Sequence, residues 1–336
     1  MDNKINRTRF SDFFSYEWIR IIIFSIVVIF VWELIFTVTG VKLTTGQQFK
    51  ILYDLTVDSE TEDEIIPLSY MDGAFSYDVL RIDREFLSQA NVNMLDVRYQ
   101  TQDCDVVVTS NAYKTGENDT VRREAFLIID TLFMWSYEEM LVDGENYLLS
   151  LLKDEYQGDK TKVYDYDNLD QTKIDALFNR RQEKDNRFRA QEDKLLGMQN
   201  ERSRIQLLCK NLNMAKYLLD NHADIFLQYT RHEQSVNNNP TDNNLNVLQN
   251  EKTNNLQKYG KEKLSYGIDV GKLKITGNTE GKHSASSFFA KDGKTDEVIL
   301  MAFNFIEYQP HLQFESLSFM NSVVHLCSNL LDGFYA

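Results

Sequence analysis

The first pattern along the chain is an apolar run from Ile21 to Val41, which holds 21 residues and a single charge, at Glu33. An α-helix rises 1.5 Å per residue, so a run of this length crosses the roughly 30 Å hydrocarbon core of a bilayer. We therefore predict one transmembrane helix at residues 21–41. It follows a cytoplasmic tail at residues 1–20 and precedes an extracytoplasmic domain at residues 42–336.

The basic residues around this run predict its direction. Two of them, Lys42 and Lys50, follow it, whereas four precede it: Lys4, Arg7, Arg9 and Arg20. The side richer in Lys and Arg normally stays in the cytoplasm, which places residues 42–336 outside the cell membrane. A cleaved signal peptide is the alternative, since Val38-Thr39-Gly40 offers small residues to a peptidase. The apolar run is longer than a signal core, which favours an uncleaved anchor.

Glu33 raises a separate question, because it lies eight residues before the predicted outer end of the helix. A carboxylate within a bilayer is costly and needs an aqueous or a protein contact. The side chain either extends toward the headgroups or contacts a polar residue of a partner protein in the membrane. Both interpretations remain open from the sequence.

Residues 42–336 mix strand-like and helix-like patterns. Aromatic and β-branched residues predict strands at Gln48–Val57, Phe75–Leu80 and Met94–Tyr99. Continuous apolar runs at Asp105–Thr109 and Val298–Phe305 predict strands covered on both faces, as in a parallel sheet between helices. The predicted fold class is α/β, with mixed or parallel sheets flanked by helices.

Apolar residues change to a helical spacing in three other regions. They predict helix within Val121–Leu152, throughout residues 171–235 with Asp170 as its cap, and at the closing segment Phe314–Asp332. The Asn-rich segment 236–260 contains Pro240 and is predicted to be a long loop. The domain could therefore form two lobes around a helical region.

Composition and charge exclude several classes of function. The net charge of −15 argues against a nucleic-acid partner, because phosphate binding needs a basic face. The three cysteines show no CxxC spacing and the histidines no metal spacing, so neither a metal nor another cofactor is expected. Phosphate-loop, HExxH, GxSxG and kinase motifs are all missing from the sequence, and we predict that the protein is not an enzyme.

One stretch carries a resemblance to a known family. The segment MLDVRYQTQDCDVVVTS, followed by Asn111, is similar to the strand pair that precedes the ligand cleft in bacterial extracytoplasmic solute-binding proteins. The resemblance in organisation extends over Phe49–Ala336. It implies a periplasmic-binding-protein-like fold in which two α/β lobes close on a ligand. The long charged helical region and a transmembrane anchor in place of a lipidated cysteine depart from that family.

The resemblance also suggests ligand-binding residues. Ser110 and Asn111 follow the strand and offer hydrogen bonds, while Asp269 could hold a hydroxyl or an ammonium group. Three aromatic residues could stack on a sugar-like face, although rings of this kind more often belong to the core: Trp135, Tyr137 and Tyr266.

These features predict a membrane-anchored solute-binding protein that captures a small molecule or assists a transporter. The alternative is a structural or assembly subunit of a membrane complex, which uses the helical region and Glu33 for partner contacts. Ligand binding would favour the first function, and a dependence of assembly on Glu33 would favour the second.

Overall fold

The computed structural model describes part of the chain and divides it into two units. The described residues are 7–39, 48–54, 75, 79, 81–87, 94–110, 125–182, 191–277, 280–289, 295, 298–305 and 314–335, with the side chains of 7–17, 36–39, 180–182, 191–193 and 287–288 left aside. The first compact unit is Met1–Thr44 and the second is Thr45–Ala336. Each unit is described by itself.

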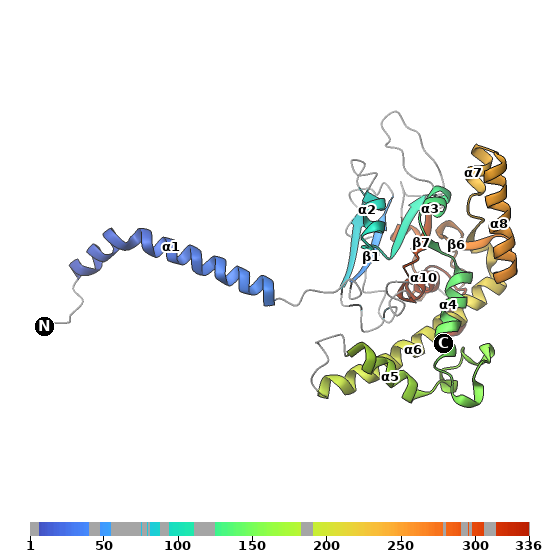
Figure 1. The fold of residues 1–336 in the computed structure, drawn as a ribbon, viewed down its shortest axis with the longest axis horizontal. Coiled ribbons are helices and arrows are strands. Elements are labelled where there is room, and N and C mark those ends of the chain that lie inside the picture. The colour runs from blue at the N-terminus through green and yellow to red at the C-terminus, as the bar shows by residue number, and fades with distance from the viewer. Residues whose placement is uncertain are drawn as a thin grey trace. The chain divides into compact units, whose positions relative to one another are not determined.

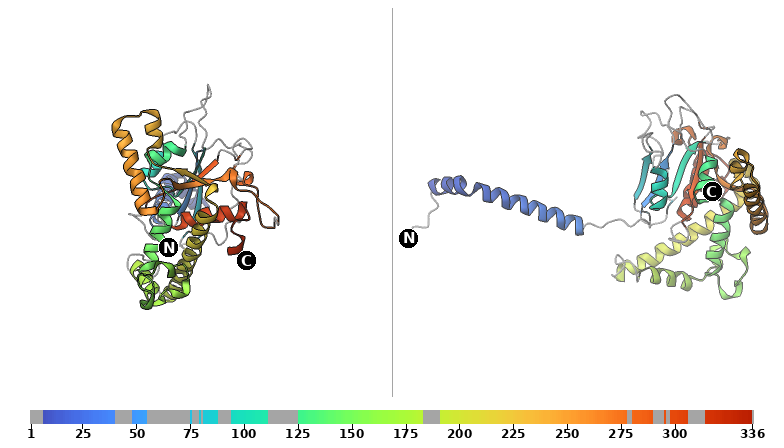
Figure 2. Two further views of the ribbon diagram at one scale, coloured as in Figure 1. Left: turned by 90° about the vertical axis from the view of Figure 1, so that its right-hand side faces the viewer. Right: turned by 45° about the horizontal axis from the view of Figure 1, so that its top comes forward.

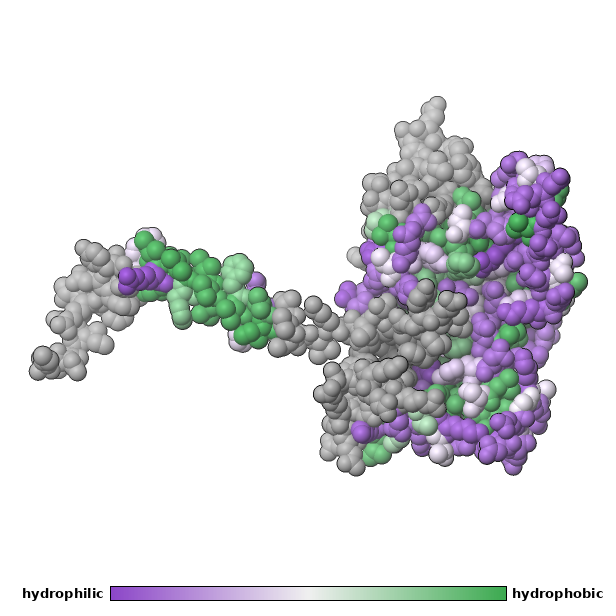
Figure 3. Space-filling view, in the orientation of Figure 1, coloured by the Kyte–Doolittle hydropathy of each residue, from purple (hydrophilic) through white to green (hydrophobic). Residues whose placement is uncertain are grey.

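The first unit contains one long helix, α1 (Arg7–Thr39). Its segment Trp18–Ile35 is long and apolar enough to cross a membrane, and none of this segment is buried within the protein. In Figure 3 these side chains form a continuous hydrophobic band. A helix of this kind near the N-terminus is consistent with a signal anchor or a signal peptide.

The second unit is built on one mixed seven-stranded sheet with the order β2-β1-β3-β7-β6-β5, in which β4 also pairs with β7 (Figure 1). β1 runs parallel to β2 and β3, whereas β7 is antiparallel to β3, β4 and β6. The pair β5 and β6 is also antiparallel. The strands are β1 (Gln48–Tyr53), β2 (Arg81–Phe86), β3 (Val106–Ser110), β4 (Met134–Trp135), β5 (Phe226–Tyr229), β6 (Leu264–Asp269) and β7 (Val298–Phe303).

Helices pack on both faces of this sheet (Figure 2). The described helices of the second unit are α2 (Met94–Gln100), α3 (Ala125–Thr131), α4 (Tyr137–Leu149), α5 (Gln171–Gln182), α6 (Gln191–Asn221), α7 (Glu233–Asn238), α8 (Asp242–Tyr259), α9 (Ser286–Phe289) and α10 (Phe314–Cys327). Of these, α5 packs on α6 rather than on the sheet (Figure 1). Short 3₁₀ segments lie at Asp154–Tyr156, Lys160–Lys162, Tyr166–Asn168, Ala223–Ile225, Val270–Lys272 and Asp332–Phe334.

The alternation of side chains along β7 separates two hydrophobic cores. Val298, Leu300 and Ala302 belong to a cluster with buried residues of α4, α6 and α10, and we call this side of the sheet the α10 face. Ile299 and Met301 belong to a second cluster with buried residues of α2 and α3, and we call this side the α3 face. All six residues of β7 are buried, which confirms the strand covered on both faces that its apolar run predicts.

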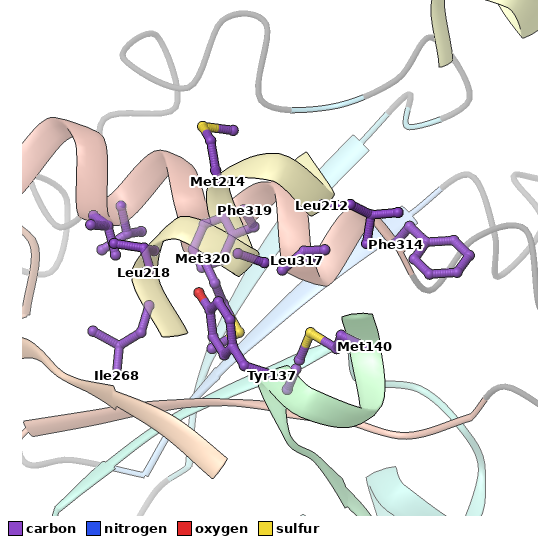
Figure 4. Packing of buried hydrophobic residues seen from close by; sticks show 14 of the residues in the cluster. Tyr137, Met140, Leu212, Met214, Leu218, Ile268, Phe314, Leu317, Phe319 and Met320 are labelled. Atoms are coloured by element: carbon purple, nitrogen blue, oxygen red, sulfur yellow. The ribbon is translucent and has the colours of Figure 1, made fainter. Parts of the chain in front are cut away.

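The core on the α10 face is dense around α10. Figure 4 shows Tyr137 of α4 directed toward Leu218 of α6 and Met320 of α10, and Met214 and Leu317 belong to the same cluster. Glycine allows the closest approach of these helices: a Cβ atom at Gly144 of α4 would lie 2.5 Å from Leu212 Cδ2 of α6. The predicted helix around Gly144 is therefore present, and the glycine marks a tight contact between helices.

Three segments differ from the sequence predictions. Met94–Tyr99 is the helix α2 and not a strand, because Leu95 and Tyr99, four residues apart, share a helix face that packs on the second cluster. The strand β5 interrupts the predicted continuous helix of residues 171–235. Of the predicted strand Phe75–Leu80, the described residues Phe75 and Val79 are not in strand conformation, and the observed strand β2 begins at Arg81.

The Asn-rich segment predicted as a loop is largely the helix α8. The Thr241 side chain caps its start by accepting the Asn244 N–H, and Gly260 ends it in the left-handed conformation with φ 72°. Asn255 is its buried residue, and its side chain donates a hydrogen bond to the Glu262 carbonyl. The stability of a polar helix of this kind comes from its caps and from a few side-chain contacts, because it has no apolar stripe to bury.

Gly267 lies where β6 approaches β7 most closely. A Cβ atom there would lie 2.7 Å from Met301 Cγ and 2.8 Å from the Leu300 carbonyl oxygen. The pairing of β6 with β5 is irregular at the same point, between Phe226 and Gln228. Only glycine, which lacks a Cβ atom, fits this approach without a shift of the backbone.

We expect Gly267→Ala to lower the free energy of unfolding by about 1–3 kcal/mol, because the packed strands must move apart to admit a methyl group. Denaturant unfolding of the full chain in detergent measures this change. Gly333→Ala is the matched control, since nothing lies within 4 Å of the added methyl there. Similar losses for both variants would contradict the close approach of β6 to β7.

Candidate functional site

The directions of three strands bring their carboxyl ends to one edge of the sheet. β1 and β3 are parallel, and both β3 and β6 are antiparallel to the β7 strand that lies between them. β1, β3 and β6 therefore run the same way. We call the edge where they end the carboxyl edge.

The pairing register aligns specific residues along this edge. Thr109 of β3 and Asp269 of β6 are both opposite Ile299 of β7. Tyr53 is opposite Val108, so Asp54, which follows Tyr53, is level with Thr109. Residues that are level in adjacent strands lie on the same face of a sheet.

We call Asp54, Thr109, Ile299 and Asp269 the carboxyl-edge row. It lies on the α3 face, because Ile299 belongs to the hydrophobic cluster there. Adjacent strands are about 4.8 Å apart, which separates the two aspartate backbones by roughly 14 Å. The row thus presents two carboxylates, a hydroxyl and an aliphatic side chain along one line.

Ser110, which the sequence predicts as a ligand-binding residue, lies beside the row. It is the last residue of β3, is opposite Val298 and is 6% exposed. The alternation of side chains directs it to the α10 face. Asn111, the next predicted site residue, lies outside the described residues. The structure therefore brings Ser110 and Asp269 to the two sides of the first residues of β7.

Two polar atoms near this edge lack hydrogen-bond partners. The Oδ1 atom of Asp269 is buried without a partner, while its Oδ2 atom lies 3.3 Å from Lys272 Nζ. The hydroxyl of Tyr53, at the end of β1, is also buried without a partner. Burial raises the pKa of Tyr53 above its usual value, so the phenol stays neutral. A buried polar atom without a hydrogen bond costs free energy, and a bound ligand could supply the missing hydrogen bonds.

The three predicted aromatic residues lie in the core. Trp135 of β4 is opposite Ala302, near the end of β7 far from the carboxyl edge, and its Nε1 donates to Asp143 Oδ2 at 3.3 Å. The Tyr137 hydroxyl donates to Asn321 Oδ1 at 3.3 Å. Trp135, Tyr137 and Tyr266 are all 0% exposed. Their proposed stacking on a ligand stays a prediction, and their observed contacts are those of core residues.

Tyr266 holds Arg231 in place. The Arg231 Nε atom donates to the Tyr266 hydroxyl at 2.9 Å, and Nη2 donates to the Met134 carbonyl at 2.6 Å. The guanidinium also lies 5.2 Å from the centre of the Tyr266 ring and 5.6 Å from that of Phe133. Arg231, which follows β5, is thus hydrogen-bonded to β6 through the Tyr266 hydroxyl and to the start of β4 through the Met134 carbonyl.

The described residues offer no group of three or more His, Cys, Asp or Glu side chains that could hold a metal ion. The three cysteines are free and buried, and burial raises the pKa of Cys209 and Cys327 to about 12. Thiols with such a pKa remain protonated near neutral pH and are poor nucleophiles. None of the three cysteines belongs to the carboxyl-edge row.

Asp54 is the residue of this site that the sequence analysis missed. Its signal is present in the segment QFKILYD, where a carboxylate directly follows a buried strand. Carboxyl ends of parallel strands often carry ligand-binding residues, so Asp54 is a ligand-binding candidate for the same reason as Ser110. The level position of Asp54 and Asp269 depends on strand order and is visible only in the folded sheet.

Comparison with known proteins adds no relative: no protein-family model, no curated protein and no solved structure matches this chain. The class of protein is therefore defined by the structure alone. It is a chain with an N-terminal apolar helix and a mixed seven-stranded α/β sheet flanked by helices.

We expect Tyr266→Phe to lower the free energy of unfolding by about 1–3 kcal/mol, because Arg231 loses a buried acceptor. Tyr259→Phe is the control, since that ring packs at the margin of the same hydrophobic cluster. Thermal unfolding of the full chain in detergent compares the two variants. An unchanged melting temperature for Tyr266→Phe would contradict the structural function of this hydroxyl.

Proposed function

We propose that the protein is a membrane-anchored extracytoplasmic domain of the solute-binding type, which holds a small ligand at the carboxyl edge of its sheet. The observation that carries this proposal is the position of Asp269 at the carboxyl edge, level with Thr109 across Ile299, with one Asp269 oxygen buried and unpartnered. The function requires no chemical conversion of the ligand.

The strand order supports this location. β1 is followed in the chain by β2, which lies on one side of it, whereas β3, on its other side, is followed by β4, which pairs with β7. Ligands of open α/β sheets bind outside the carboxyl ends of the strands, at such a point of reversal. Asp54 and Ser110 occupy these two strand ends.

The chemistry of the row supports a hydroxyl-bearing or cationic ligand. A carboxylate oxygen accepts hydrogen bonds and cannot donate them when ionised, so Asp269 matches a ligand hydroxyl or ammonium group. The threonine hydroxyl at position 109 can both donate and accept. The net charge of −15 also favours encounter with cations over anions.

The membrane topology forms part of the proposal. The helix α1 contains the apolar segment Trp18–Ile35, and basic residues are richer before it than after it. This distribution supports an N-terminus in the cytoplasm and a domain on the outer side. An uncleaved anchor would keep the ligand-binding domain beside a transporter or another membrane protein.

A second function, assembly of a membrane complex, is favoured by one observation. Leu195 and Leu196, near the start of α6, are 60% and 58% exposed. Two adjacent exposed leucines can form part of a partner contact. Migration of the native protein in a larger complex, without any response to small molecules, would support this function over ligand capture.

We expect a ligand to raise the melting temperature of the full chain in detergent when the protein is screened with amino acids, oligopeptides, sugars and amines. Ligand at 100 times its dissociation constant adds about 2.7 kcal/mol to the folded state. Asp269→Asn should weaken binding by roughly tenfold, equal to about 1.4 kcal/mol. Asp242→Asn is the control, because Asp242 is an exposed carboxylate in the first turn of α8.

Absence of any shift across the panel would contradict ligand capture of these classes. Equal binding by wild type and Asp269→Asn would instead place the ligand away from the carboxyl edge. These two results separate the function from the location of its site.

We also expect the chain to stay in the membrane fraction after a carbonate wash and to keep its N-terminal segment in an intact-mass measurement. The physical reason is the insertion of an apolar helix of bilayer length. Release of a shortened chain that begins after Val38-Thr39-Gly40 would identify a cleaved signal peptide and contradict the anchor.

A further inference from the structure

The end of α10 and the turn after it are tied to the segment that leaves β6 at the carboxyl edge. The Thr276 N–H donates to the Asn329 side-chain oxygen at 2.9 Å, and the His283 N–H donates to the Leu326 carbonyl at 2.8 Å. Lys282, which lies between these two donors in the sequence, contacts the same part of α10 through its side chain. The segment after β6 is thus held to α10 at several points.

Lys282 makes the most extensive of these contacts. Its Nζ atom donates to His325 Nδ1 at 3.1 Å and to the His325 carbonyl at 2.5 Å, and it forms an ion pair with Asp332. The Lys282 side chain is only 5% exposed. These three acceptors match the three N–H groups of an ammonium, and one of them is a carboxylate, so the buried amine is charged. We call Lys282, His325 and Asp332 the Lys282 clasp.

The geometry of the clasp sets the protonation state of His325. A lysine ammonium donates hydrogen bonds and cannot accept them. The Nδ1 atom that faces Lys282 must therefore present a lone pair, and the neutral ring carries its proton on Nε2. The Tyr335 ring stacks on this imidazole with a centroid distance of 3.6 Å and an angle of 9° between the planes.

The charged groups around His325 include two cations and one carboxylate. Lys282 comes from the segment after β6, and Lys210 of α6 places its Nζ atom 3.7 Å from the centre of the Tyr335 ring. The Asp332 carboxylate lies 3.6 Å from Nδ1 and favours the protonated ring, but it is 43% exposed and is already paired with Lys282. Burial is the largest influence, and together with the two lysines it lowers the pKa of His325 from 6.5 to about 4.

The place of His325 in α10 makes the contact with Lys282 informative. His325 lies in the last turn of the helix, where the helix dipole would ordinarily stabilise a protonated histidine. Here the Lys282 ammonium binds the His325 carbonyl directly and occupies that place. Protonation of the ring would add a second positive charge beside the first.

We propose that the Lys282 clasp is an acid-released contact, which holds the segment after β6 against α10 while His325 is neutral and releases it when His325 is protonated. Protonation puts an N–H group and a positive charge against the buried ammonium, so the hydrogen bond between the two side chains is lost. The clasp contains no strand residue, so its release leaves the pairing of the sheet in place.

The sign of the pH dependence follows from linkage. The pKa of His325 is about 4 in the closed clasp and 6.5 for a ring without these neighbours. Between these values the open state binds more protons than the closed state, so the clasp becomes more stable as the pH rises. Its full stability is present above the higher value and is lost as the pH falls toward the lower one.

Hydrogen exchange of the full chain in detergent tests this proposal. After correction for intrinsic rates, protection of peptides that contain Thr276 and His283 should fall by roughly 20-fold between pH 7 and pH 5. Peptides from β7 serve as the internal reference and should keep their protection over the same range.

His325→Asn tests the part played by the ring. The asparagine side-chain oxygen replaces Nδ1 as an acceptor for Lys282 and cannot be protonated in this range, so protection at pH 5 should stay at its neutral value. His232→Asn is the matched control, because asparagine tolerates the left-handed conformation of that residue, with φ 70°. This control should keep the wild-type dependence on pH.

Lys282→Met provides a second variant if His325→Asn does not fold. Loss of the ammonium should raise the titration midpoint of His325 by about one pH unit or more, measured by NMR of histidine-labelled protein. The proposal is overturned if the wild type shows no fall in protection between pH 7 and pH 5, if His325→Asn keeps that fall, or if Lys282→Met leaves the His325 midpoint unchanged.

Discussion

The structure of the second unit depends on the pairing of β7 with strands that come much earlier in the chain. β7 is antiparallel to β3 on one side and to both β4 and β6 on the other. All six of its residues are buried, and they contribute to both hydrophobic clusters. Without this strand, the parallel group β2-β1-β3 and the antiparallel pair β5-β6 would have no common sheet or core.

The same pairing explains the candidate site. Because β7 runs opposite to both neighbours, β3 and β6 end at the same edge, and Thr109 and Asp269 are level across Ile299. At the opposite edge, the Asp105 backbone N–H donates to the Lys50 carbonyl of β1 and its carbonyl accepts the Phe303 N–H of β7. The strand order therefore places the unpartnered Asp269 oxygen and the buried Trp135 at opposite edges of the sheet.

Continuous apolar runs predicted β3 and β7, which are buried on both faces, and the helical spacing of apolar residues predicted α10. The short helix α2 could not be distinguished from a strand, since seven residues hold too few turns to show a period. α8 is mostly polar, and its caps at Thr241 and Gly260 were its main sequence signal. The sequence predicts that Ser110 follows a strand, but the strand order that brings Asp269 to the same edge and the burial of Tyr266 arise from contacts distant in sequence.

The account is tested most directly by proton–proton NOEs across β7 in an isotopically labelled sample of the protein. The sheet order predicts cross-strand NOEs from Ile299 to Thr109 on one side and to Asp269 on the other. NOEs that join β3 directly to β6, or that place β7 parallel to β3, would contradict the arrangement on which the candidate site depends.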